Sequence, residues 1–153
     1  MMKWLVAQVN KKNKGFTLIE MVVVMAIIAV LIAIAVPQVL RLINKSKVTA
    51  DLSSAKAIAT QIQQYMADGG NVNLNDQPIS ADNNLKSYVE QRINGGIPKI
   101  RFNSGWDWRV TANTTSEEVY VGVSTGSGSG STTWWLFPEI NPQDDTNPYW
   151  KYK

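Results

Sequence analysis

The chain changes abruptly from polar to apolar near its amino end. Residues 1–15 are basic and polar, whereas Phe16 to Val36 is an apolar run of 21 residues in which Glu20 carries the only charge. A helix of that length rises by about 30 Å, which is the thickness of the hydrocarbon core of a bilayer. A carboxylate in that core costs about 2.5–3.5 kcal/mol on insertion scales. We therefore expect a membrane-spanning helix and a partner that neutralises Glu20.

The helical pattern continues beyond Pro37 but changes character. Apolar residues now recur at spacings of three and four and form one stripe: Val48, Leu52, Ala55, Ile58, Ala59, Ile62, Tyr65 and Met66. The polar positions between them are expected to face solvent: Lys47, Asp51, Ser54, Lys56, Thr60, Gln61 and Gln64. The pattern predicts one helix over residues 17–67, kinked at Pro37 and ending at the paired glycines Gly69 and Gly70.

Three later segments, 106–112, 118–124 and 132–137, alternate apolar and polar residues with the period of two that a half-buried strand shows. Short polar connections between them predict an antiparallel meander. In the last segment Trp134 and Leu136 are expected on one face, with Trp135 and Phe137 exposed on the other. Residues 71–84 are rich in Asn and Asp and are expected to be a loop. A short helix over 85–93 should follow, capped by Asp82 or Asn83.

These elements predict an α+β fold. A long N-terminal α-helix, hydrophobic in its first half and amphipathic in its second, packs on a small antiparallel β-sheet and supplies the hydrophobic layer that the sheet lacks. At 153 residues the chain has room for one such globular domain.

Charge and composition exclude several classes of function. The first 15 residues hold four of the 15 basic residues, which leaves 11 basic against 12 acidic side chains in the rest of the chain. That balance does not indicate a nucleic-acid-binding surface, whereas the basic amino end fits a cytoplasmic N-terminus with the rest of the chain outside. The chain has no cysteine and no histidine, so it can form neither a disulfide nor a His-dependent catalytic site. We expect it not to be an enzyme.

The junction itself resembles the prepilin processing motif of type IV pilins and pseudopilins. It reads Lys-Lys-Asn-Lys-Gly over residues 11–15, then Phe-Thr-Leu-Ile-Glu over residues 16–20. The resemblance implies that a prepilin peptidase cuts between Gly15 and Phe16 and methylates the new amino terminus of Phe16. It also implies that Glu20 accepts the amino terminus of a neighbouring subunit and that Pro37 is the family's usual helix proline. The expected organisation is a leader peptide (1–15), a transmembrane and filament-core helix (16–40) and a globular head (41–153).

The resemblance implies a structural subunit of a type IV pilus-like filament that serves adhesion, motility or DNA uptake. Its expected partners are further copies of the chain, the prepilin peptidase and an inner-membrane assembly platform. The precursor would be a single-pass protein of the cytoplasmic membrane, with its head outside, before joining a surface filament. Two alternatives stay open: a pseudopilin of a type II secretion or competence system, and a minor pilin that acts as an adhesive or DNA-binding module.

The amino end also admits two simpler interpretations. It could be a secretory signal cleaved after the Ala-Ile-Ala sequence of residues 33–35, or a plain membrane anchor. Neither explains a carboxylate inside the apolar run. The prepilin interpretation is therefore preferred.

Three other segments carry residues that some binding sites use. The Gly-Ser repeat over residues 126–130 lies between predicted strands and lacks a lysine, so it is interpreted as a hairpin connection rather than a phosphate loop. Residues 141–147 offer oxygen ligands for calcium, but their spacing fits turns better, and no cofactor is expected. The late aromatic residues could stack on nucleic acid or sugars beside nearby cations, but are expected to be core: Trp106, Trp108, Trp134, Trp135, Tyr149, Trp150 and Tyr152.

Overall fold

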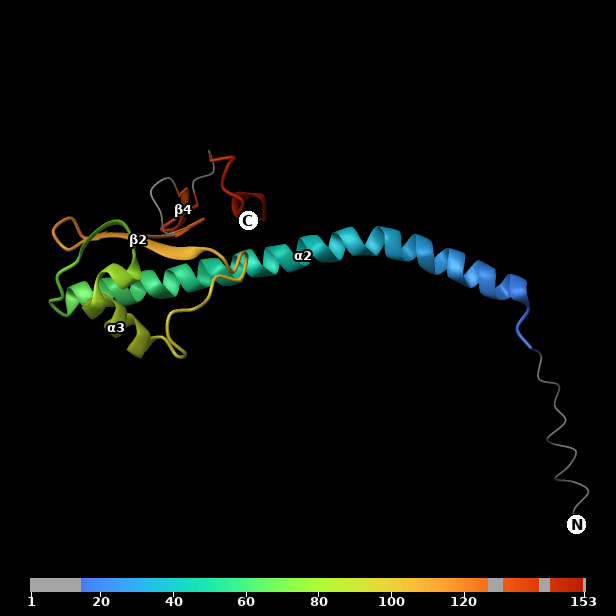
Figure 1. Cartoon of the computed structure of the whole chain (residues 1–153), viewed down its shortest axis with the longest axis horizontal. Coiled ribbons are helices and arrows are strands. Elements are labelled where there is room, and N and C mark those ends of the chain that lie inside the picture. The colour runs from blue at the N-terminus through green and yellow to red at the C-terminus, as the bar shows by residue number, and fades with distance from the viewer. Residues whose placement is uncertain (1–14, 127–130, 141–143, 153) are drawn as a thin grey trace, which may run out of the picture. The chain divides into compact units, whose positions relative to one another are not determined.

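The computed structural model describes residues 15–126, 131–140 and 144–152. The chain separates into two units, Met1–Leu40 and Arg41–Lys153. The second unit is called the head below. Figure 1 labels the helices α2 and α3 and the strands β2 and β4.

The long helix was predicted within one residue at its start and correctly at its end. α2 extends over Leu18–Ala67 and includes Pro37 in its interior. It ends in a Schellman motif, in which Gly70 N donates to Tyr65 O at 2.9 Å and Gly69 N donates to Met66 O at 3.1 Å. Gly69 has a φ of 89°, a left-handed conformation that a glycine adopts without steric cost. Glycine at this position therefore sets where the helix ends. The expected kink at Pro37 stays a prediction.

The head contains a four-stranded antiparallel sheet in the order β1-β2-β3-β4. Its strands are β1 (Asn73–Pro78), β2 (Asp107–Asn113), β3 (Glu118–Ser124) and β4 (Thr133–Phe137). The predicted meander corresponds to β2, β3 and β4, so the α+β prediction is confirmed. Two single-turn 3₁₀ helices, η1 (Ile79–Ala81) and η2 (Trp150–Tyr152), complete the described elements.

Strand β1 corrects the prediction of a loop over residues 71–84. Its composition, Asn-Leu-Asn-Asp-Gln-Pro, indicates turns, because Asn, Asp and Pro are depleted in strands. β1 is nevertheless an edge strand in which Leu74 is buried and Asn73 and Asn75 are exposed. The register shifts between Leu74 and Gln77, and Asp76 there has a φ of 48°. An irregular, polar edge strand of this kind has no period-two hydrophobic signal.

The short helix α3 (Asn83–Arg92) begins two residues earlier than expected. Asp82 is its N-cap, as one of the two predicted alternatives: its carboxylate accepts from Asn84 N at 2.9 Å and from Leu85 N at 3.1 Å. Leu85 and Val89, one turn apart, are its buried residues. α3 therefore packs one narrow apolar face against the core.

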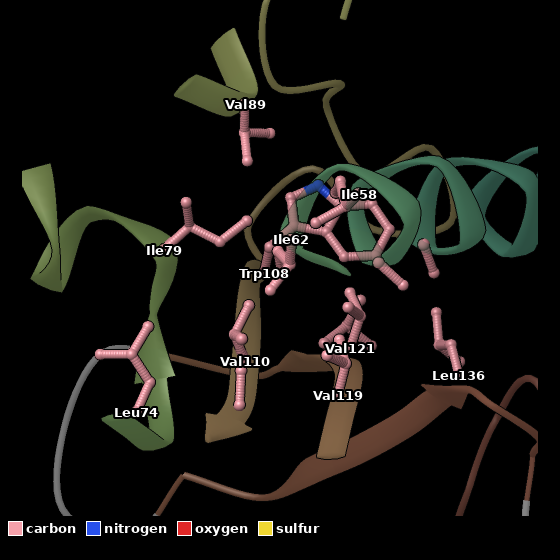
Figure 2. Packing of buried hydrophobic residues seen from close by; sticks show 14 of the residues in the cluster. Ile58, Ile62, Leu74, Ile79, Val89, Trp108, Val110, Val119, Val121 and Leu136 are labelled. Atoms are coloured by element: carbon pink, nitrogen blue, oxygen red, sulfur yellow. The ribbon is translucent and has the colours of Figure 1, made fainter. Parts of the chain in front are cut away.

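The core lies between the head portion of α2 and the inner face of the sheet. Ile58 and Ile62 of α2 face Val110 and Val121 of the strands in Figure 2. Of the predicted stripe, five residues are buried and the remaining three are partly buried against the core: Leu52, Tyr65 and Met66. A fully buried Val or Ile side chain contributes about 1.5–3 kcal/mol, so this cluster is the main source of stability in a chain without disulfides.

Strand β4 differs from the predicted alternation of faces. Gly122 pairs with Trp135 and Val121 with Phe137, so Leu136 is an extra residue in the ladder. A one-residue bulge reverses which face the following side chain occupies. Phe137 therefore packs against the core instead of lying exposed beside Trp135. Trp135 is also partly buried rather than exposed, and its ring lies 6.1 Å from that of Tyr120.

Gly122 of β3 is required by close packing rather than by an unusual φ. A Cβ atom at this position would lie 2.5 Å from Trp134 O and 2.9 Å from Trp135 Cε3. We expect Gly122→Ala to lower the free energy of unfolding by about 2 kcal/mol, because the β4 backbone would have to move. Urea unfolding followed by tryptophan fluorescence measures this. The matched control is Gly126→Ala, where no atom lies within 4 Å of the added Cβ; equal effects would contradict the packing argument.

Candidate functional site

The predicted processing site lies at the start of the described chain. Gly15, Phe16 and Thr17 precede α2 and are outside regular secondary structure. The Phe16 side chain is 78% exposed, and no atom lies within 4 Å of a Cβ built on Gly15. Within the described part of the chain, the two residues that flank the predicted scissile bond are therefore exposed and outside the helix. The rest of the leader, residues 1–14, lies outside the described residues.

Glu20 closes the first turn of α2 through a capping box. Its Oε2 atom accepts from Thr17 N at 2.8 Å and from Thr17 Oγ1 at 2.8 Å. In return, Glu20 N donates to Thr17 Oγ1 at 3.3 Å. This is the reciprocal Thr-x-x-Glu arrangement that satisfies backbone donors at a helix start, and the positive end of the helix dipole favours the carboxylate there. The lone acid in the apolar run therefore has a partner within its own chain.

The capping box places the predicted assembly residues next to one another in the chain. Phe16 directly precedes Thr17, which holds the Glu20 carboxylate. Cleavage after Gly15 would create an ammonium on Phe16, one residue from that carboxylate's donor. The segment therefore combines a site for a new positive charge with a negative charge held at the same end of the helix.

Pro37 lies inside α2 and has no N–H, so the carbonyl of Ala33 loses its usual helical donor. This position is 17 residues from Glu20 and does not contact it. The structure thus separates Pro37 from the cluster of Gly15, Phe16 and Glu20.

The helix surface between these positions is apolar and exposed. Large apolar side chains are exposed from Phe16 to Leu40. Among the described residues, α2 is the one helix long and apolar enough to cross a membrane. A shallow hollow of about 380 Å³ lies on this surface and is lined by Val23, Ala26, Ile27, Val30 and Leu31. A second apolar helix or lipid chains could cover this surface.

A buried carboxylate in the head was missed by the sequence analysis. Asp51 was predicted to face solvent, but it is fully buried. Its Oδ1 accepts from Arg101 N at 2.8 Å, and its Oδ2 accepts from Phe102 N at 2.9 Å and from Tyr149 Oη at 2.8 Å. Asp51 thereby joins α2 to the loop before β2 and to the C-terminal segment. These partners are 50 to 98 positions away, so no local pattern could reveal them.

Tyr149 is fully buried at the other end of this connection. Burial raises the pKa of the Tyr149 hydroxyl well above its ordinary value, and the hydrogen bond to Asp51 and the charge of that carboxylate raise it further. The Tyr149 ring also lies 4.9 Å from that of Phe102. The C-terminal segment is therefore fixed by a buried hydroxyl and by aromatic packing.

Most of the late aromatic residues are structural, as expected. Trp108 and Tyr149 are buried, and Trp106, Trp134 and Tyr152 pack against the core. Trp150, which was also expected in the core, is instead 37% exposed. Arg109, the nearest cation in sequence, is itself buried and donates to Asp76 O at 3.0 Å and to Ser131 Oγ at 3.2 Å. It therefore presents no stacked cation to a nucleic acid.

The remaining candidate loops are only partly described. Residues 127–130 and 141–143 lie outside the described residues. In the calcium candidate, Asp144 Oδ1 accepts from Thr146 N at 3.0 Å and Asn147 Oδ1 accepts from Tyr149 N at 3.0 Å. Among described residues, no group of three or more Asp, Glu, His or Cys could hold a metal ion. The calcium alternative stays a prediction.

The amino-terminal part of the chain is similar to several known proteins. Residues 10–36 match the family described as the prokaryotic N-terminal methylation motif. The chain is 36% identical over 63 residues to the type IV major pilin protein PilA of Myxococcus xanthus, covering 41% of this chain and 29% of that protein. It is 41% identical over 59 residues to the type II secretion system core protein G of Pseudomonas aeruginosa, covering 39% of this chain and 42% of that protein. Both matches span less than half of the relative's own length.

A longer match reaches into the head. The chain is 39% identical over 121 residues to a fimbrial protein of Pseudomonas aeruginosa, covering 79% of this chain and 73% of that protein. No solved structure matches the chain. The extent of this match, together with the methylation motif at the start of an exposed apolar helix, shows that the chain belongs to the type IV pilin family of fimbrial proteins.

Proposed function

We propose that this chain is a structural subunit of a type IV pilus-like filament. The observation that carries the proposal is the arrangement at the start of α2: an exposed Gly15–Phe16 junction, then a capped Glu20, then an exposed apolar helix. A soluble protein would bury such a helix, and a plain anchor would not need the methylation motif that surrounds Gly15 and Phe16. A subunit that leaves the membrane for a filament core uses both features.

The proposed assembly step is an exchange of partners for Glu20. A prepilin peptidase removes residues 1–15 and methylates the amine of Phe16, which remains cationic. An assembly platform in the membrane then moves the subunit into the growing filament, where Glu20 of one subunit accepts the Phe16 ammonium of another. A buried ion pair adds little net stability, but either charge left alone in apolar surroundings costs several kcal/mol. The pair therefore sets the axial register, while the apolar sides of the helices provide cohesion.

The proposed location follows from the same features. Before assembly, the precursor spans the cytoplasmic membrane once, with its basic amino end inside and its head outside. After assembly it belongs to a filament at the cell surface. The subunit has a mechanical role and carries out no catalysis.

A second candidate is a pseudopilin of a secretion system. The observation in its favour is the 41% identity to the type II secretion system core protein G over 59 residues. This candidate shares the processing and assembly steps and differs in the length and location of the filament. Electron microscopy of sheared surface material separates the two, because long surface fibres containing this chain support the pilus.

Intact-mass analysis of the exported protein tests the proposed processing. We expect a subunit that begins at Phe16 and carries one added methyl group, because the prepilin peptidase cuts after Gly15 and then methylates the amine that the cut creates. Substituting Gly15 with a bulky residue such as leucine provides the control, and should leave the precursor uncut in the membrane. A wild-type chain that begins at Val36, or that retains Met1, would contradict the proposal.

A further inference from the structure

The apolar run of α2 is followed by a basic stretch without acidic residues. Arg41, Lys45 and Lys47 lie in the first seven residues of the head, and residues 21–50 contain no Asp or Glu. Arg41 and Lys45 are exposed and four positions apart, so they lie on neighbouring positions of one helix face. The next acid along the chain is Asp51, whose carboxylate is buried. Positive charge is therefore concentrated where the apolar run ends.

The C-terminal segment adds aromatic and basic side chains near the first residues of the head. Asn44 Nδ2 donates to Tyr152 Oη at 3.5 Å, which brings η2 beside the first turns of the head portion of α2. The hydrogen bond between Tyr149 and Asp51 fixes the preceding turn. On η2, Trp150 is 37% exposed and Lys151 is exposed. Two segments of the head about 100 positions apart in sequence thus meet at Asn44.

The cations of this group have no carboxylate partners within the described part of the chain. The ion pairs there are Lys86 with Glu90 and Arg92 with Asp68, both elsewhere in the head. Arg41, Lys45 and Lys151 take part in neither. An anionic partner outside the chain would complement them.

Membrane orientation does not explain these cations. The positive-inside rule depends on an excess of Lys and Arg on the cytoplasmic side, which the leader lysines supply. Basic residues on the opposite side reduce that excess. Their position, next to tryptophan and tyrosine, is instead the composition found where helices cross the headgroup layer of a membrane.

We propose that Arg41, Lys45, Trp150 and Lys151 form an interfacial collar that binds anionic phospholipid headgroups at the outer face of the cytoplasmic membrane. The inference rests on the proposed membrane-inserted precursor and adds a lipid partner to it. The guanidinium and ammonium groups bind headgroup phosphates, and the exposed part of the Trp150 ring occupies the interface. Tyr152 packs against the core and holds η2 beside α2 through Asn44. The collar holds the head at the bilayer until assembly removes the subunit.

The test uses the full-length precursor reconstituted into vesicles of phosphatidylcholine alone or of an equal mixture with phosphatidylglycerol. A nitroxide attached to a small fraction of headgroups quenches tryptophan fluorescence at the membrane surface. We expect more quenching in the mixed vesicles, reversed by 1 M salt because the Debye length then falls to about 3 Å. In a Trp4→Phe background, which removes the tryptophan of the basic leader, Trp150→Phe should remove most of this lipid-dependent quenching. Trp135→Phe, which changes a partly buried tryptophan on β4, should leave it unchanged.

A charge series tests the cations. Neutralising Arg41, Lys45 and Lys151 to glutamine should reduce the quenching in mixed vesicles to the level in phosphatidylcholine, since each cation near an anionic surface strengthens binding about fivefold. The matched control neutralises three exposed cations elsewhere on the head, namely Lys56, Arg92 and Lys99. Unchanged urea midpoints would show that both triple variants remain folded.

Resistance to alkaline extraction shows whether the chain is inserted in the membrane. It therefore distinguishes failure of the proposed collar from failure of the proposed membrane precursor. Normal insertion with equal quenching in both lipids, or equal effects of the two triple variants, would overturn the collar and leave the proposed function standing. Failure of the chain to insert in either lipid would overturn the proposed membrane precursor and the collar together.

Discussion

Glu20→Gln is expected to be processed and methylated normally but to be absent from filaments. Glutamine keeps a side-chain oxygen that can accept from Thr17 N, so the helix start remains capped. It has no charge to neutralise the ammonium that cleavage leaves on Phe16. An unpaired cation in an apolar filament core costs several kcal/mol, which corresponds to a loss of incorporation of more than a hundredfold. Immunoblots of sheared filaments against total membrane protein measure the ratio.

Two matched variants separate charge from capping. Thr17→Ala removes the hydroxyl that Glu20 contacts but keeps the charge, so it should still assemble, with a helix start weakened by about 1 kcal/mol. Glu20→Asp keeps the charge on a shorter side chain and should assemble in part. If Glu20→Gln formed filaments at the wild-type level while Thr17→Ala did not, capping rather than charge pairing would be the role of Glu20.

Asp51→Ala is expected to be the most destabilising single change in the head. It would leave Arg101 N, Phe102 N and the Tyr149 hydroxyl without their acceptor inside the protein. Buried donors that lose a charged acceptor cost about 1.5–3 kcal/mol each, and partial rearrangement leaves a net loss of about 4 kcal/mol. Urea unfolding of the purified chain in detergent, followed by tryptophan fluorescence, measures it. Lys56→Ala, at an exposed position of the same helix, is the control and should change stability by less than about 0.5 kcal/mol.

Tyr149→Phe tests the same connection from its other end. At neutral pH it should cost about 1–2 kcal/mol, because Asp51 keeps its two backbone donors. The pKa of the Tyr149 hydroxyl is raised above its ordinary value of 10.0 in the folded chain. Above that pH the unfolded chain loses this proton and the folded chain keeps it, so the stability of the wild type should fall as pH rises. Tyr149→Phe should lack this part of the fall, and parallel pH profiles for the two proteins would contradict the buried hydrogen bond.

The features readable from sequence were those with a local pattern. The apolar run, the amphipathic stripe and the Gly69-Gly70 end determine α2 within one residue. Alternation located β2, β3 and β4, because their inner faces are occupied by Val, Ala, Trp and Leu. The Thr-x-x-Glu capping box at Thr17 was also visible, but the acid was interpreted only as a lone charge. The Thr-x-x-Glu pattern itself indicates that Glu20 has a hydrogen-bond partner within its own chain before assembly.

The features that sequence could not predict depend on distant contacts. Asp51 occupies a polar position of the helix pattern, and only the fold brings Tyr149 to it, 98 positions later. The bulge at Leu136 lies opposite Gly122, and a glycine inside a strand pattern indicates a bulge or a close backbone approach, but it does not indicate which residue of the partner strand is extra. The face of Phe137 could therefore not be assigned. Strand β1 is polar because it lies at the edge, where pairing with β2 rather than burial defines it.

The capping box implies that polymerisation is reversible at little electrostatic cost. In the proposed assembly step, a subunit in the bilayer has its Glu20 carboxylate hydrogen-bonded by Thr17, and a subunit in the fibre has it paired with a neighbour's amine. The Glu20 carboxylate has a partner both in the bilayer and in the fibre. Its contribution to the free-energy difference between these two states is therefore small. A protomer drawn back out of the fibre recovers its own hydrogen bonds at once and can be stored and used again.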